Sequence, residues 1–440
     1  MAEHRYQSET LAIHAGQIPD VATGARALPI YQTTSFVFDS AEHAASLFNL
    51  QTFGNVYSRL SNPTVAVLEE RVAALEGGRA ALASASGMAA EAMALMTILQ
   101  QGDHVVAAGA LYGGSVTMLA VSLARFGIET SFVVGTDPVA FAAALRPNTR
   151  ALFAESLGNP SLALLDIAAV ADVAHAHGVP LVIDNTVPSP FLCNPIRFGA
   201  DIVLHSATKY LAGHGTTLGG VMVEGGTFPW DNGKFPGMTE PSPGYHGVKF
   251  YETFGDFGFT MRARMETLRV YGAALSPMSA WQILQGTETL HLRMERHCSN
   301  ARRVAEFLRN HPRVSWVNYP GLPDHPQYPL LERQMRRVDG APGASGLLAF
   351  GVKSGSTRSG AGMAAGVKFI EAAQFMSHLA NIGDTRTLII HPASTTHRQL
   401  DAAQQIAAGV LPDMVRMSVG LEHIDDILWD IDQALARCGD

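Results

Sequence analysis

Short apolar runs alternate with longer stretches of helical spacing between residues 63 and 223. The apolar runs, each bounded by turn residues, predict buried strands at 80–83, 104–108, 130–134, 151–155, 181–184, 202–205 and 220–223. The stretches between them predict helices at 63–75, 88–100, 115–126, 139–145 and 167–177. Continuous apolar strands that alternate with helices are typical of βαβ units, so we expect an α/β fold with a mostly parallel sheet covered by helices.

The pattern changes on either side of this region. Residues 1–62 are irregular and rich in aromatic side chains, and form either an arm that reaches another surface or an ordinary packed segment. Glycine and proline at 225–258 predict a long ordered loop or insertion. Helices are then expected at 261–271, 280–284, 290–310 and 424–438, strands at 315–319, 347–352, 388–390 and 415–418, and an exposed turn at 351–362. We therefore expect a large α/β domain at 63–285 and a smaller α+β domain at 286–440.

Composition and charge narrow the class of protein. A chain of 440 residues with 47% hydrophobic and 16% charged residues has enough apolar material for two domains. The net charge of −8 offers no electrostatic footprint for nucleic acid. The first ten residues lack the apolar core of a secretory signal, and no apolar stretch approaches the roughly 20 residues of a membrane span. Three scattered cysteines without CxxC spacing indicate a reducing compartment, so we expect a cytoplasmic protein.

A lysine stands directly after one predicted strand. Lys209 ends the segment SATK at 206–209, which follows the strand expected at 202–205. Open α/β sheets bind ligands at the carboxyl ends of their strands, and a partly desolvated lysine there suits Schiff-base chemistry. The hydroxyl groups of Ser206 and Thr208 are able to bind a phosphate. From this segment alone, a lysine at a strand end that simply points into water is the more ordinary interpretation.

Two further segments lie at the same predicted edge of the sheet. Asp184 ends the strand expected at 181–184, where a buried carboxylate needs a partner, although it could equally cap a turn. The segment SASGMA at 84–89 enters a helix, whose first N–H groups could bind an anion, although Ser86 could equally be a plain N-cap. Together, a phosphate cradle, an acid and a lysine are what pyridoxal 5′-phosphate (PLP) requires.

At this point the sequence resembles the fold-type I PLP enzymes of cysteine and methionine metabolism, over nearly its whole length. The resemblance rests on segments in the family's order: 57–64 (YSRLSNPT), 86–88 (SGM), 111–114 (LYGG), 155–160 (ESLGNP), 184–186 (DNT), 206–210 (SATKY), 391–397 (HPASTTH) and 416–420 (RMSVG). It implies a large PLP-binding domain, a smaller C-terminal domain and an N-terminal arm that reaches the neighbouring subunit.

The resemblance also implies roles for particular residues. Lys209 would be the Schiff-base lysine, Asp184 the partner of the pyridine nitrogen and Tyr112 the aromatic residue stacked on the ring. The implied phosphate ligands are Ser86, Gly87, Met88, Ser206 and Thr208, with Tyr57 and Arg59 from the neighbouring subunit. Asn159 would contact the phenolic oxygen of the ring. Arg416 would bind the substrate carboxylate, with Asn381 and Tyr57 as further substrate contacts, and Lys209, Tyr112, Asp184 and Tyr57 would be the catalytic set.

Within the family, the details resemble the sulfhydrylase branch. Gly114 stands where methionine γ-lyases usually have a cysteine, and 235–241 (FPGMTEP), 244–247 (GYHG), 381–384 (NIGD) and 394–397 (STTH) match the sulfhydrylases. The implied reaction joins O-acetyl-L-homoserine to sulfide or methanethiol and gives L-homocysteine or methionine with acetate. Alternatives are cystathionine γ-synthase, methionine γ-lyase or O-succinylhomoserine sulfhydrylase activity, and, in another class, a cofactor-free binding module or Schiff-base aldolase. The implied assembly is a homodimer or homotetramer with shared active sites.

The remaining polar clusters have simpler interpretations. His175 and His177 lie on a surface-like helix, and His291 and His297 are six residues apart, the wrong spacing for one helical face, so no metal is expected. The cysteines are expected to be packing residues. One set of arginines on the helix expected at 290–310 is interpreted as a solvated face: Arg293, Arg296, Arg302, Arg303 and Arg309.

Overall fold

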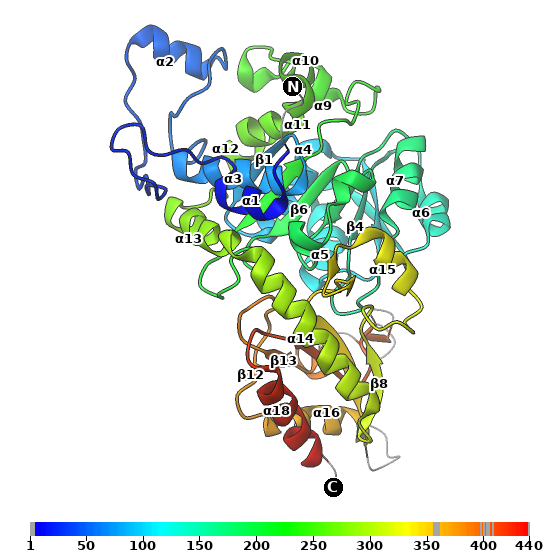
Figure 1. Ribbon diagram of the computed structural model, residues 1–440. Coiled ribbons are helices and arrows are strands. Elements are labelled where there is room, and N and C mark those ends of the chain that lie inside the picture. Colours follow the sequence, from blue (N-terminus) through cyan, green and yellow to red (C-terminus); the bar gives the residue numbers. More distant parts are fainter. Residues whose placement is uncertain are drawn as a thin grey trace.

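The computed structural model describes residues 5–354, 361–396, 398, 401, 405, 406 and 409–438. The chain forms a larger lobe, a smaller lobe that contains the C-terminus, and an N-terminal arm that stands away from the larger lobe (Figure 1). The expected turn at 351–362 and the segment at 394–397 lie partly outside the described residues, as do the first four residues of the N-terminal segment.

The larger lobe is built on a seven-stranded sheet with the order β1-β7-β6-β5-β4-β2-β3. The strands are β1 (Ala80–Ser84), β2 (His104–Ala108), β3 (Glu129–Val133), β4 (Thr149–Glu155), β5 (Leu181–Asp184), β6 (Ile202–Ser206) and β7 (Gly220–Glu224). All neighbouring pairs are parallel except those of β7, which runs antiparallel to both β1 and β6. The expected fold class, an α/β domain with a mostly parallel sheet, is therefore confirmed.

Helices cover both faces of this sheet (Figure 1). They are α3 (Pro63–Glu76), α4 (Gly87–Ile98), α5 (Gly113–Thr117), η1 (Met118–Ser122), η2 (Leu123–Phe126), α6 (Pro138–Ala144), α7 (Ile167–Ala176), α8 (Ser189–Leu192) and η3 (Pro195–Phe198). Side chains of Asn62, Ser86, Asp137 and Asp166 cap α3, α4, α6 and α7 by accepting backbone N–H groups. The single helix expected at 115–126 is instead three consecutive segments: an α, a π and a 3₁₀ turn.

The N-terminal region is only partly irregular, contrary to the prediction. It contains α1 (Ser8–His14) and α2 (Ala41–Phe48), joined by extended chain. Arg71 of α3 is fully buried and donates hydrogen bonds to the Ala15 carbonyl at 3.0 Å and to Gln17 at 2.9 Å. These bonds fasten α1 to the larger lobe, whereas α2 and the chain around it project outward (Figure 1).

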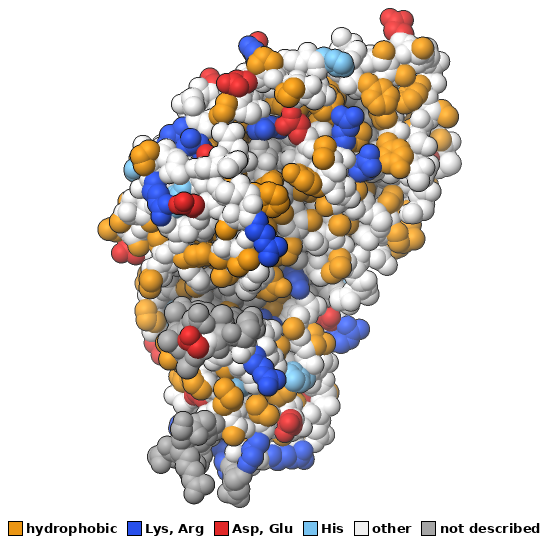
Figure 2. Space-filling view, turned by 180° about the vertical axis from the view of Figure 1, so that it is seen from behind, with side chains coloured by type: hydrophobic (Ala, Val, Ile, Leu, Met, Phe, Trp, Pro, Cys, Tyr) orange, Lys and Arg blue, Asp and Glu red, His pale blue; other side chains and the backbone are white. Residues whose placement is uncertain are grey.

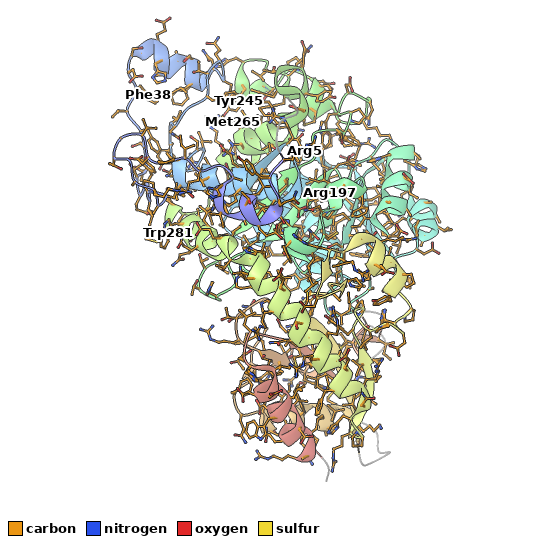
Figure 3. All side chains as sticks on the ribbon, viewed as in Figure 1. Arg5, Phe38, Arg197, Tyr245, Met265 and Trp281 are labelled. Carbon is orange, nitrogen blue, oxygen red and sulfur yellow. The ribbon has the colours of Figure 1, made fainter. Side chains whose placement is uncertain are left out.

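The predicted insertion at 225–258 is ordered and contains short helices. These are α9 (Pro236–Thr239), η4 (Pro243–Tyr245), α10 (Phe250–Phe254) and η5 (Gly255–Phe257), followed by α11 (Gly258–Arg262), η6 (Ala263–Leu268) and α12 (Arg269–Tyr271). Trp230 stacks on Phe259 with 5.4 Å between ring centroids. Tyr245 lies beside Met265, with its hydroxyl 3.5 Å from the sulfur (Figure 3). Aromatic packing therefore replaces regular structure as the source of order here.

The smaller lobe contains a five-stranded sheet with the order β12-β13-β14-β11-β8. Its strands are β8 (Val314–Asn318), β11 (Leu347–Val352), β12 (Ser377–His378), β13 (Leu388–Ile390) and β14 (Met414–Ser418), and a separate hairpin joins β9 (Arg337–Val338) to β10 (Ala341–Pro342). The helix α13 (Pro277–Glu288) still packs against α3 and α1 of the larger lobe. The helical elements that follow it are α14 (Leu290–Asn310), α15 (Tyr328–Gln334), α16 (Ala361–Ala372), η7 (Pro392–Ser394) and α18 (Ile424–Ala436). The helix α14 runs from the larger lobe into the smaller one (Figure 1), close to the predicted domain boundary.

One of the arginines on α14 is not solvated, which corrects the sequence interpretation. Arg293 is 5% exposed, and its guanidinium donates to the carbonyl groups of Tyr210, Leu211 and Gly286. Arg296, Arg303 and Arg309 are exposed and Arg302 is half-buried. The face of α14 that carries Arg293 packs against the chain that follows β6, so the buried guanidinium there supplies hydrogen bonds to the Tyr210 and Leu211 carbonyl groups, which lie outside any helix or strand.

All three cysteines are buried, as packing residues would be. Among the described residues, no helix is both long and apolar enough to cross a membrane. The described part of the chain also holds no cluster of three or more histidine, cysteine, aspartate or glutamate side chains arranged for a metal ion.

Candidate active site

A cavity of about 240 Å³ lies at the carboxyl ends of β4, β5 and β6. The N-terminal turn of α4 and the segment after β2 form one side of it, and residues of the smaller lobe, Asn381 and Arg416 among them, close the other. Open α/β sheets bind ligands at this edge, because the loops that follow adjacent strands converge there.

Lys209 points into this cavity rather than into bulk water. Its Nζ donates a hydrogen bond to Oδ1 of Asn381, which comes from the smaller lobe, at 2.6 Å. Burial and the neighbouring Arg416 charge lower the pKa of Lys209 below the ordinary value of a lysine. A lysine with a lowered pKa more readily supplies the neutral amine that nucleophilic and basic chemistry needs.

Asp184 lies at the end of β5 and also lines the cavity. Its Oδ1 accepts the backbone N–H of Thr186 at 2.8 Å, so the interpretation as a turn cap is correct for one oxygen. Burial raises the pKa of Asp184, while its hydrogen bonds with Thr186 act in the opposite direction. A buried carboxylate of this kind is stabilised by a cationic ring nitrogen placed against it.

The start of α4 forms a cradle of small residues. Ser86 accepts the N–H of Ala89 at 3.1 Å as an N-cap, which leaves the N–H groups of Gly87 and Met88 without a partner inside the helix. Gly87 lies against Ser206, and a Cβ added to it would stand 2.6 Å from the Ser206 Cβ. The Thr208 hydroxyl is bonded to the backbone of Gly219. Close backbone approach at a helix N-terminus is suited to a phosphate.

Arg416 reaches the cavity from β14 of the smaller lobe. Its guanidinium donates to Oδ1 of Asn159 at 3.0 Å and to the carbonyl of Asn381 at 3.1 Å. Its buried Nε has no hydrogen-bond partner among the described residues. Burial lowers the pKa of Arg416 to about 10. A cation held this way at a cavity wall, with donor capacity left over, is suited to a carboxylate ligand.

Tyr112 stands at the entrance to the cavity, and its side chain is 53% exposed. Its ring lies over Gly114, where an added Cβ would come within 2.5 Å of a ring carbon and 3.1 Å of the Met88 sulfur. Any other residue at position 114 would therefore displace the Tyr112 ring.

Tyr57 and Arg59 do not line this cavity within one chain. They lie on the segment that follows α2, where the Arg59 guanidinium stands 5.3 Å from the centre of the Tyr57 ring. The other predicted site residues all line the cavity: Lys209, Asp184, Tyr112, Ser86, Gly87, Met88, Asn159, Ser206, Thr208, Arg416 and Asn381.

Two carboxyl groups of the cavity were not selected by the sequence analysis. Glu155 ends β4 and pairs in register with Asp184, so its place at a strand end was an available signal. Glu91 lies inside α4, where the sequence offered no signal. Its Oε2 accepts the Ser115 hydroxyl at 2.8 Å, and its Oε1 has no partner in the part of the chain that the structure describes. Burial and the charge of Asp184 raise the pKa of Glu91 to about 8.

The residues present fit PLP. An amine with a lowered pKa, a buried carboxylate, a cradle at a helix N-terminus and a guanidinium with an unpartnered Nε share one cavity. This combination defines a PLP-dependent enzyme of the α/β class. The chain belongs to the family of Cys/Met metabolism PLP-dependent enzymes, whose profile matches residues 9–436.

Individual relatives agree with this assignment. The chain is 54% identical to an O-acetyl-L-homoserine sulfhydrylase of Leptospira meyeri, covering 98% of this chain and 97% of the relative. It is 50% identical to O-acetyl-L-homoserine sulfhydrylase 1 of Thermus thermophilus, over 97% and 99% of the two chains. A crystal structure of a Campylobacter jejuni protein assigned as an O-acetylhomoserine (thiol)-lyase superposes with a TM-score of 0.92 at 39% identity, covering 98% of this chain and 100% of that one. That structure contains N′-pyridoxyl-lysine-5′-monophosphate.

Proposed function

We propose that the protein is a PLP-dependent O-acetyl-L-homoserine sulfhydrylase, which joins O-acetyl-L-homoserine and sulfide to give L-homocysteine and acetate. The observation that carries this proposal is the cavity that unites Lys209, Asp184 and Arg416 in a chain 54% identical to a sulfhydrylase. Methanethiol in place of sulfide would give methionine by the same reaction.

In this proposal the cavity residues divide between cofactor and substrate. Lys209 would hold PLP covalently, the cradle at 86–88 with Ser206 and Thr208 would bind its phosphate, and Asp184 would face its ring nitrogen. Tyr112 would cover one face of the ring and Asn159 would contact the ring oxygen. Bound PLP supplies an electron-withdrawing ring that stabilises negative charge at the substrate α-carbon.

The chain's own groups would then move the protons. Arg416 binds the α-carboxylate of the substrate, which places the α-proton near the Lys209 amine. Because burial and Arg416 lower its pKa, Lys209 is suited to take that proton and return it later. Asn381 accepts the hydrogen bond from Lys209 and holds the amine in place. Asp184 keeps a proton on the ring nitrogen.

The charges in the cavity favour an acetyl over a succinyl ester. Among the described lining residues the only cations are Lys209 and Arg416, which this proposal assigns to the cofactor and the α-carboxylate. A succinyl group would bring a second carboxylate that no lining side chain neutralises. We expect kcat/KM to be about 100-fold higher with O-acetyl- than with O-succinyl-L-homoserine, on the basis of roughly 2–3 kcal/mol for an unpaired charge.

That comparison tests the proposed function directly. Homocysteine and acetate are measured with each ester in the presence of sulfide. Equal or better turnover of the succinyl ester would contradict the acetyl assignment. Faster reaction with cysteine than with sulfide would favour a cystathionine γ-synthase, and release of ketobutyrate and ammonia from methionine would favour a γ-lyase.

We also propose that the arm at 1–62 completes the active site of a neighbouring subunit. The phosphate end of the cavity contains no cation among the described lining residues, whereas Arg59 and Tyr57 lie outside the cavity on the same chain. The arm also leaves Val37 and Phe53 exposed by 96% and 75%, and Figure 2 shows hydrophobic side chains gathered on the larger lobe. Surfaces of this kind are normally covered by a partner, here a second copy in a homodimer or homotetramer.

Subunit exchange between two inactive variants tests this assembly. Arg59→Ala and Lys209→Ala proteins are mixed in equal amounts, and turnover is followed after exchange. If Arg59 serves its neighbour, each hybrid dimer contains one intact site, so about one quarter of the wild-type activity should return. Two Arg59→Ala chains carrying different tags provide the exchange control. Absence of recovery despite proven exchange would show that Arg59 serves its own chain.

A further inference from the structure

The carboxyl group of Glu155 lies between two loops that carry site residues. Its Oε1 accepts the backbone N–H of Tyr112 at 2.5 Å, and its Oε2 accepts the backbone N–H of Asn159 at 2.9 Å. Tyr112 belongs to the loop after β2, and Asn159 to the loop after β4, the strand that Glu155 itself ends. One side chain thus ties together neighbouring loops at the ligand edge of the sheet.

Only an ionised carboxyl group makes both bonds well. Both partners are N–H donors, so both side-chain atoms that face them must accept. A glutamine of the same shape has one accepting oxygen and one donating NH₂, which would face an N–H. An aspartate keeps the charge but is one methylene shorter, so it cannot reach both loops from the same Cα.

This position is costly for a carboxylate. Glu155 is 9% exposed and pairs in register with Asp184, which brings two acids side by side. Burial, followed by the charge of Asp184, raises the pKa of Glu155 well above that of an ordinary glutamate. Its two hydrogen bonds with backbone N–H groups oppose that rise. The hydrogen bonds from the Tyr112 and Asn159 N–H groups are the interactions that offset the cost of burying the Glu155 carboxylate.

The loops after β2 and β4 each contribute a side chain to the cavity. Tyr112 presents its ring at the entrance, over Gly114. Asn159 accepts a hydrogen bond from the Arg416 guanidinium at 3.0 Å, so a shift of Asn159 would also shift Arg416. Glu155 is therefore linked to the aromatic cover by one oxygen and, through Asn159, to the carboxylate-binding arginine by the other.

We propose that Glu155 is a positioning residue of the active site, which holds the ring of Tyr112 and the Asn159–Arg416 pair in register with bound PLP and substrate. The part of its test that measures turnover of O-acetyl-L-homoserine rests on the proposed function, whereas the part that measures the environment of bound PLP does not.

The variant that tests it is Glu155→Gln in the holoenzyme. We expect PLP to remain bound, with its visible circular dichroism band altered because the Tyr112 ring is no longer held. We expect kcat/KM for O-acetyl-L-homoserine to fall about 10- to 100-fold, mostly through KM, because Arg416 loses its fixed place. Glu155→Asp protein should show the same altered dichroism band and the same fall in kcat/KM.

The chain offers a closely matched control. Glu224, 2% exposed at the end of β7, accepts the backbone N–H groups of Phe259 and Thr260 at 3.3 and 2.8 Å. Because β7 is antiparallel to β6, Glu224 pairs with Ile202 at the opposite edge of the sheet, away from the cavity. Glu224→Gln should lower the melting temperature and leave the dichroism band and KM unchanged. The proposal is wrong if Glu155→Gln lowers only the melting temperature and leaves the dichroism band and KM unchanged. It is also wrong if Glu155→Asp protein has the wild-type dichroism band and KM.

A measurement on the unmodified holoenzyme covers the case in which Glu155→Gln fails to fold. Hydrogen–deuterium exchange with single-residue resolution should show slow exchange at the N–H groups of Tyr112 and Asn159, although both lie in loops. Rapid exchange at either N–H would overturn the proposal. If wild-type protein binds PLP but does not turn over O-acetyl-L-homoserine, the proposed function fails, while the dichroism and exchange results still decide the role of Glu155.

Discussion

Lys209→Ala protein is expected to lose essentially all turnover, with kcat reduced about 10⁴-fold. The side chain combines two roles in the proposed function, covalent attachment of PLP and transfer of the α-proton, and alanine supplies neither. Its Nζ is placed for both by Asn381 at 2.6 Å, and its pKa is lowered by burial and Arg416. The measurements are homocysteine formation and the visible absorption of the bound cofactor.

Lys249, which is half-buried and pairs with Glu252 at 2.8 Å outside the cavity, provides the control. Lys249→Ala should keep both the activity and the absorption spectrum of the wild-type protein. Turnover by Lys209→Ala at more than a few per cent of the wild-type rate would show that another group transfers the proton, and the assignment of the site would fail.

Arg416→Lys protein is expected to show a KM for O-acetyl-L-homoserine about 100-fold higher, with a much smaller change in kcat. Lysine keeps the charge but lacks the planar fork that binds a carboxylate through two parallel bonds. Arg416 also uses two separate nitrogens to reach Asn159 and the Asn381 carbonyl, and lysine has only one nitrogen to replace them. The loss of roughly 2–3 kcal/mol of carboxylate binding corresponds to the stated factor.

Arg71→Lys serves as the matched comparison. Arg71 is also a buried arginine that donates to a carbonyl and a side-chain oxygen, but it reaches from α3 to the chain just after α1 and does not line the cavity. This variant should lower the melting temperature and leave KM unchanged. A normal KM in Arg416→Lys protein would mean that the substrate carboxylate binds elsewhere.

The strand ends of the larger lobe were predictable because their signal is local. The apolar run of β5 ends in Asp184, and that of β6 ends three residues before Lys209, so each run predicts both the strand and the polar residue at its carboxyl end. Parallel pairing then brings those ends to one edge, whatever the details of packing. The same logic applied to Glu155, at the end of β4, and would have found it.

Other features depended on packing that no local pattern expresses. Arg293 shares its helix with exposed arginines, and only its contact with the carbonyl groups after β6 makes it a buried residue. Glu91 lines the cavity because of how α4 is rotated against the sheet. The division of 113–126 into α, π and 3₁₀ turns was likewise not predictable, because each piece is only about one turn long and its apolar positions do not distinguish the three periods.

The sequence by itself determined the α/β class, the succession of strands and helices along the chain, and the chemical groups at the strand ends. These features were predictable because periodicity and residue type are local properties. The tertiary structure alone decided which distant groups meet: Arg416 and Asn381 reach Lys209 from the smaller lobe, and Glu155 links the loops of Tyr112 and Asn159. It also placed Tyr57 and Arg59 outside their own chain's cavity. Contacts between residues far apart in sequence, and the burial that shifts their pKa values, exist only once the two lobes have packed together.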